Sequence, residues 1–75
     1  MTSLQFAEIV ELAVKENIID NDARLMLLAR IESKYTPRAA IDEMRSLDEI
    51  GNVAWLWFVS RIKEAESEQQ QPHGA

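Results

Sequence analysis

The chain has no cysteine, and its 75 residues include only two glycines, Gly51 and Gly74, and two prolines, Pro37 and Pro72. Without cysteine, neither a disulfide nor a thiolate metal site can stabilise so short a chain. So few turn-forming residues leave little room for the tight turns of a small β-fold. We therefore expect an all-α protein whose stability comes from helix packing or from oligomerisation.

Residues for catalysis and metal binding are also scarce. The single histidine, His73, lies between Pro72 and Gly74 in the expected tail, where it cannot form a triad or a metal site because each needs partners held in place. Gly51 has no second glycine close by, so no phosphate-binding loop is present. We expect a protein that is not an enzyme, with no catalytic residue, no cofactor and no metal.

The sequence lacks a long hydrophobic run. The apolar segment 53–59 is far shorter than the ~20 residues that span a bilayer. Residues 1–20 have no basic leader, and acidic residues interrupt their apolar positions, which is untypical of a secretory signal. These features predict a cytoplasmic protein that does not enter a membrane.

The formal charge is −5, which disfavours non-specific binding to nucleic acid and to anionic lipid. The charge is uneven, however, because residues 24–45 carry five basic side chains against three acidic ones. This basic middle section leaves a nucleic-acid hypothesis open.

Three short helices follow from local signals. Thr2 and Gln5 have the spacing of a capping box, and apolar residues then recur at helical spacing over about 3–16. Asp20, Asn21 or Asp22 can cap a second helix over 23–35. Thr36 and Pro37 both end that helix and begin a third, with Thr36 as the cap and Pro37 in the first turn.

The apolar stripes predict which side of each helix is buried. On the third helix the apolar stripe consists of Ala40, Ile41, Met44 and Leu47. On the second helix it consists of Leu25, Leu28, Ile31 or Glu32, and Tyr35, and it is widened by Met26, Leu27 and Ala29. Leu28 and Ile41 lie in the middle of their stripes, so we expect both in the core.

A fourth helix is predicted over residues 47–68. Ser46 and Glu49 form a second candidate capping box that would start it, although the third helix could instead bend at this point. From residue 64 on, glutamates and glutamines replace the apolar pattern. The expected fold is a small bundle of three to four helices over residues 1–68, with a long, strongly apolar C-terminal helix and a disordered tail at 69–75.

The apolar run Val53–Val59 is the feature with the clearest functional content. Trp55 and Trp57 lie about 200° apart on a helix, so a small monomer cannot easily bury both rings. We expect Trp57 to continue the core stripe of Ile50, Val53 and Ala54, and Trp55 to face a partner; alternatively, the helix is central and covered on both sides. The predicted partner-binding residues are Trp55, Leu56, Trp57, Phe58, Val59 and Ile62.

The first functional hypothesis is a protein–protein interaction module that acts as an adaptor, regulator or inhibitor, with a protein partner or a second copy in a homodimer. The alternative is a helix-turn-helix-like nucleic-acid-binding regulator using Arg30, Lys34, Arg38 and Arg45. Asp42 can pair with both Arg38 and Arg45, which is typical of a solvated salt-bridge ladder and would repel phosphates. Nucleic acid is therefore the disfavoured partner.

Overall fold

The computed structural model describes the backbone of residues 1–70 and the side chains of residues 1–67. Over these residues the chain forms four helices and no strand: α1 (Ser3–Lys15), α2 (Asn21–Glu32), α3 (Pro37–Ser46) and α4 (Asn52–Gln70). The expected all-α bundle is confirmed. Of the expected tail at 69–75, residues 69 and 70 belong to α4, and the remainder lies outside the described residues.

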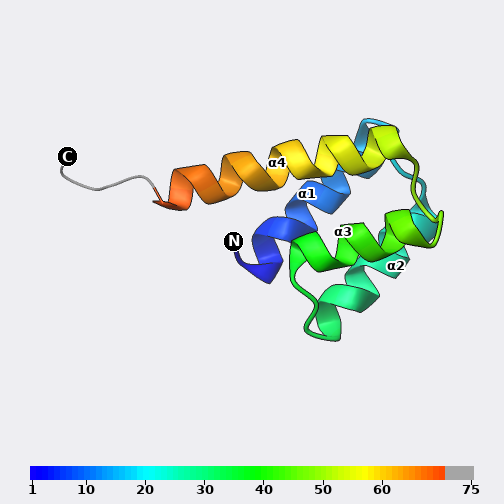
Figure 1. The fold of residues 1–75 in the computed structure, drawn as a ribbon, viewed down its shortest axis with the longest axis horizontal. Helices are drawn as coiled ribbons and strands as arrows, with labels where there is room; N and C mark the ends of the chain where they lie inside the picture. Colours follow the sequence, from blue (N-terminus) through cyan, green and yellow to red (C-terminus); the bar gives the residue numbers. More distant parts are fainter. Residues whose placement is uncertain (71–75) are drawn as a thin grey trace.

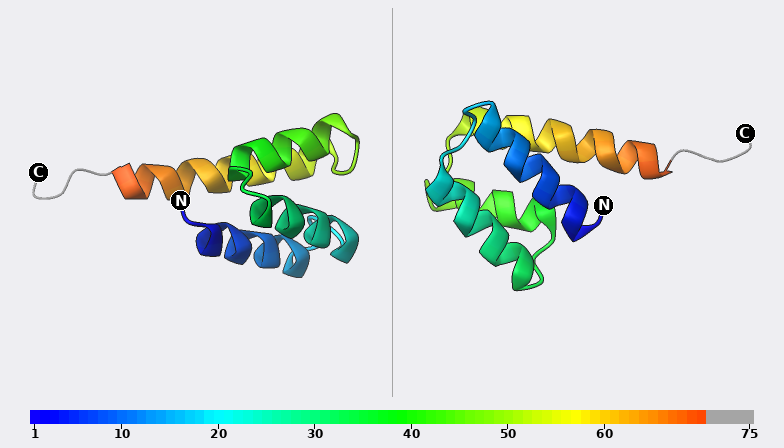
Figure 2. Two further views of the ribbon diagram at one scale, coloured as in Figure 1. Left: turned by 90° about the horizontal axis from the view of Figure 1, so that it is seen from below. Right: turned by 180° about the vertical axis from the view of Figure 1, so that it is seen from behind.

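The helices form two layers of two. Figure 2 shows α3 and α4 side by side in one layer and α1 and α2 in the other. Successive helices pack on one another, and α4 closes the bundle by packing on α1 (Figure 1). The last turns of α4 extend past the ends of α1 and α3 (Figure 1).

The first three helices begin at caps. Thr2 and Gln5 form the predicted capping box, with hydrogen bonds of 2.8 and 3.1 Å. Asp20 caps α2, and Thr36 caps α3 ahead of Pro37. These side chains accept hydrogen bonds from backbone N–H groups that the first turn of a helix leaves unpaired.

The same three helices end in one repeated turn that does not use glycine. Asn17, Lys34 and Asp48 each adopt a positive φ of 60–73°. At each site, the N–H of this residue and that of the next bond to carbonyls in the last helical turn, as in the pairs Lys34–Ile31 (3.1 Å) and Tyr35–Arg30 (3.0 Å). This hydrogen-bond pattern is the Schellman motif, which satisfies carbonyls at the helix C-terminus.

The predicted start of the fourth helix is wrong, and so is the second capping box. Ser46 is the last residue of α3, and the backbone N–H of Glu49 bonds to the carbonyl of Met44 rather than to Ser46. The chain turns at Asp48, and α4 begins later, at Asn52. Its first helical hydrogen bond runs from the N–H of Trp55 to the carbonyl of Gly51, at 3.0 Å. The positive φ at Asp48 prevents one continuous helix.

The C-terminal helix is the longest, at 19 residues, but it is not strongly apolar throughout. Its apolar half is followed by a half containing Arg61, Lys63, Glu64 and Glu66. The expectation of a strongly apolar helix holds only for its first half.

One core joins all four helices. Its members are Phe6, Val10, Ala13, Ile19, Ala23, Leu27, Ala40, Ile41, Met44, Ile50, Ala54, Phe58, Val59 and Ile62. Phe6 of α1 and Phe58 of α4 meet at its centre, with ring centroids 6.0 Å apart.

The predicted buried side holds for α3 apart from Leu47, whereas the centre of the predicted α2 stripe is wrong. Ile41 is fully buried, whereas Leu28 is only half-buried and Leu25 is 53% exposed. The fully buried leucine of α2 is Leu27, because α2 packs on both α1 and α3 and turns Ala23 and Leu27 between them. Leu47, expected in the core, is exposed at the C-terminal cap of α3.

Candidate interaction surface

An apolar surface lies on the side of α4 that faces away from the bundle. Val53 is 79% exposed and Leu56 is 51% exposed, and Ser60 is also exposed. Their spacing of three and four residues puts them in one row along the helix. We call Val53, Leu56 and Ser60 the outer face of α4.

The two tryptophans flank this outer face, and both are half-buried. The expectation that Trp57 alone faces the core is therefore wrong, because both rings pack at the edges of the core. Trp57 meets Phe58 edge-on at 5.1 Å and carries the Arg61 guanidinium 5.1 Å from its ring centroid. Each indole thus has one side in the protein and one side near solvent.

Trp55 joins α4 to α3 through polar contacts. Its indole N–H donates to Oδ1 of Asp42 at 2.8 Å. The guanidinium carbons of Arg45 and Arg38 lie 4.3 and 5.3 Å from its ring centroid, within the range of cation–π attraction. Arg38 also pairs with Asp42, Nε to Oδ1, at 3.1 Å.

These residues line an open hollow of about 660 Å³ between α3 and α4, formed by Arg38, Asp42, Arg45, Ser46 and Trp55. We call it the arginine hollow. The indole N–H of Trp55, helped by the guanidinium groups of Arg38 and Arg45, lowers the pKa of Asp42. With an aspartate ionised at neutral pH, the three charged side chains sum to +1. Arg45 has no ion pair with any of the described side chains.

The predicted partner-binding residues divide between core and surface. Leu56 is exposed, and Trp55 and Trp57 lie at the margins of the outer face. Phe58, Val59 and Ile62 are at most 9% exposed and belong to the core of their own chain. Sequence reasoning assigned Val53 to the core, although its spacing from Leu56 and Ser60 places it on the outer face.

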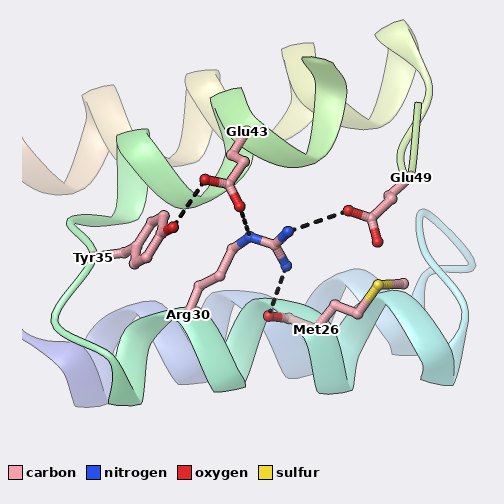
Figure 3. Close-up of polar contacts among 5 residues, drawn as sticks. All are labelled: Met26, Arg30, Tyr35, Glu43 and Glu49. Atoms are coloured by element: carbon pink, nitrogen blue, oxygen red, sulfur yellow. Dashed lines mark hydrogen bonds and ion pairs between the residues drawn. The ribbon is translucent and has the colours of Figure 1, made fainter. Parts of the chain in front are cut away.

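The residues of the nucleic-acid hypothesis are not gathered on one surface. Arg30 turns into the interface between α2 and α3, where its Nε lies 2.9 Å from Glu43 and its Nη2 lies 3.2 Å from Glu49 (Figure 3). Its Nη1 also donates to the Met26 carbonyl at 3.3 Å. Lys34 is exposed in the turn after α2, and Arg38 and Arg45 belong to the arginine hollow.

Glu43 is held from two sides. The Tyr35 hydroxyl donates to its Oε2 at 2.9 Å while Arg30 bonds its Oε1 (Figure 3). These two donors lower the pKa of Glu43, and the hydrogen bond to the carboxylate raises the pKa of Tyr35. The network is a structural link that joins α2, α3 and the turn before α4.

The described side chains contain no group of three or more histidine, cysteine, aspartate or glutamate residues arranged to hold a metal ion. No helix within residues 1–70 has the length and apolar character needed to cross a bilayer. No family model, curated protein or solved structure matches the chain.

Proposed function

We propose that this chain is a non-enzymatic protein–protein interaction module that binds through the outer face of α4 and forms a homodimer. The observation that carries the proposal is the exposure of Val53 and Leu56 in one row between two half-buried tryptophans. Burying a valine or leucine side chain contributes about 1.5–3 kcal/mol. In a symmetric dimer each side chain contributes twice.

The adjacent groups suit an interface as well. Tryptophan and arginine are enriched among the residues that dominate binding energy. Here the exposed sides of Trp55 and Trp57 lie beside arginines that already stack on their rings. A partner helix on the outer face would cover these rings without repacking the core.

Nucleic-acid binding through α2 and α3 is the weaker proposal. Arg30 is engaged by two carboxylates, and Asp42 lies between Arg38 and Arg45. A salt-dependent shift of a duplex by the wild-type protein would be evidence for it.

The test is sedimentation of the wild type beside Leu56→Asp and Leu25→Asp. Leu25 is a matched control, because it is 53% exposed on α2 against 51% for Leu56 on α4. We expect a wild-type dimer that Leu56→Asp weakens at least about a hundredfold, since each tenfold change corresponds to about 1.4 kcal/mol. Leu25→Asp should leave the dimer intact, and both variants should keep their helical circular dichroism.

Two results would count against the proposal. A wild type that stays monomeric at the highest attainable concentration contradicts self-association. Equal weakening by Leu25→Asp and Leu56→Asp would mean that association is not specific to α4.

A further inference from the structure

We propose that the α4 helices of the two subunits run antiparallel, and that Glu66 of each chain binds in the arginine hollow of the other, beside Arg45. This geometry rests on the proposed self-association, to which it adds the orientation and a specific ion pair. It follows from the length of α4, from the distribution of charge along it and from two-fold symmetry.

The first observation is the overhang of α4. At about 1.5 Å per residue, its 19 residues span roughly 28 Å, against roughly 15 Å for the 10 residues of α3. The C-terminal end of α4 therefore projects beyond the bundle (Figures 1 and 2). Lys63, Glu64, Glu66 and Ser67 in this part are all exposed.

The second observation is that the two ends of the α3–α4 layer have opposite charge. The overhang carries Glu64 and Glu66 against Lys63, whereas the arginine hollow carries Arg38 and Arg45 against Asp42. Within the described chain, Glu64 is 4.0 Å from Arg61, but Glu66 has no ion pair. Arg45 and Glu66 are thus an unpaired cation and an unpaired anion at opposite ends of one surface.

Helical geometry puts Glu66 on the correct side of α4. Glu66 follows Trp55 by eleven residues, which is close to three complete turns. Trp55 marks the side of α4 that faces α3, because its indole bonds Asp42. Glu66 therefore points along the α3 side of the helix, beyond the region that α3 covers.

Symmetry then brings the two charges together. A two-fold axis perpendicular to both helices keeps the α3 sides of the two subunits on the same side of the dimer. If the pair is centred between Leu56 and Ser60, the overhang of one chain lies level with the start of α4 in the other. Arg45 lies there, in the last turn of α3.

A parallel pair would have the opposite effect. Its two-fold axis would run along the helices, so the two acidic overhangs would lie at one end of the dimer and the two arginine hollows at the other end, on opposite faces. Glu66 could then not reach Arg45 of the partner subunit. Like charges across an interface are unfavourable. Charge complementarity therefore selects the antiparallel pair, in which the Arg45–Glu66 contact occurs twice.

The decisive experiment mixes two charge-reversed variants, Arg45→Glu and Glu66→Arg. Alone, each variant has two like-charge contacts in its dimer. We therefore expect the dissociation constant of that dimer to be at least about tenfold larger than that of the wild type. In a mixed dimer both contacts are attractive, one native and one reversed. Sedimentation of the mixture should therefore recover a dimer of nearly wild-type affinity, and added salt should reduce the differences.

Glu32→Arg is the control, because Glu32 is exposed at the last residue of α2 and lies outside the proposed interface. It should associate like the wild type. Circular dichroism will show whether Arg45→Glu keeps its fold. If it does not, Arg45→Gln replaces it. Adding Glu66→Arg to Arg45→Gln should then leave the dissociation constant of the dimer unchanged, because residue 45 no longer carries a charge.

The outcomes separate the two proposals. A dimer that is lost in Leu56→Asp but unaffected by charge reversal overturns the antiparallel geometry and leaves self-association standing. Single variants that weaken the dimer without recovery on mixing also overturn the Arg45–Glu66 contact. A monomeric wild type overturns both proposals.

Discussion

The indole nitrogen of Trp55 lies 2.8 Å from Oδ1 of Asp42, and this hydrogen bond joins the apolar half of α4 to the charged side of α3. The carboxylate that sequence reasoning assigned to an arginine ladder thus also fixes the orientation of a tryptophan. Arg38 does pair with Asp42 as the ladder predicted. Arg45, by contrast, lies over the indole ring.

Acid should weaken this link between α3 and α4. The pKa of Asp42 in the folded chain is lowered from its ordinary value, mainly because the Trp55 N–H donates to the carboxylate. A depressed pKa stabilises the fold above the unfolded value, and this contribution is lost as the pH falls through the folded pKa. In Asp42→Asn, the free energy of unfolding measured by denaturant titration should therefore decrease less as the pH is lowered (the acid limb) than it does in the wild type. Glu8→Gln, on exposed α1 surface, is the control; identical acid limbs for Asp42→Asn and the wild type would contradict the assignment.

Substitution of two leucines tests which side of α2 is buried in the core. Leu27 is fully buried and Leu25 is 53% exposed, so the same substitution should have different costs. We expect Leu27→Ala to lower the free energy of unfolding by about 2–5 kcal/mol and Leu25→Ala by far less. Thermal and denaturant melts measure both. A larger effect at Leu25 would favour the stripe predicted from the sequence.

The left-handed turn after α2 should accept glycine with a gain in stability. Lys34 has a φ of 73°, a conformation that costs an ordinary L-residue roughly 1–2 kcal/mol and glycine much less. Lys34→Gly should therefore raise the free energy of unfolding by about 1 kcal/mol. Ala29→Gly, within α2, should lower it by a similar amount, because glycine is a poor helix former. Destabilisation by both substitutions would contradict the turn geometry.

Arg30 should contribute more to stability than Arg38. The Arg30 side chain is 16% exposed and bonds Glu43 and Glu49, whereas Arg38 is 49% exposed and pairs within one helix. Arg30→Met leaves two carboxylates without their shared cation, at a cost of about 1–3 kcal/mol. Arg38→Met should change stability by less than about 1 kcal/mol. Chemical denaturation of the two variants is the measurement, and equal effects would argue against the network in Figure 3.

Much of the helical framework was determined by the sequence alone. The Thr2–Gln5 box, the Asp20 cap and the Thr36–Pro37 start all depend on residues within one turn of each other. Such interactions need no knowledge of the rest of the chain. The fully buried Ile41 followed in the same way from the clear apolar stripe of α3.

The start of α4 and the facing of α2 were decided only by the tertiary structure. The Schellman turn at Asp48 uses a residue without the glycine signature, so sequence reasoning continued the helix through it. On α2 apolar residues lie on several sides, and the choice of Leu27 over Leu25 depends on packing between two other helices.

The candidate site shows the same division. The apolar composition of 53–59 indicated an interaction surface, because one short helix cannot hide apolar residues on every side. Which of them remain outside depends on where α1 and α3 cover α4. Arg30 likewise meets Glu43 and Glu49 across 13 and 19 residues of sequence. Helical spacing specifies neighbours within one helix, whereas contacts between helices depend on the packing of the whole bundle.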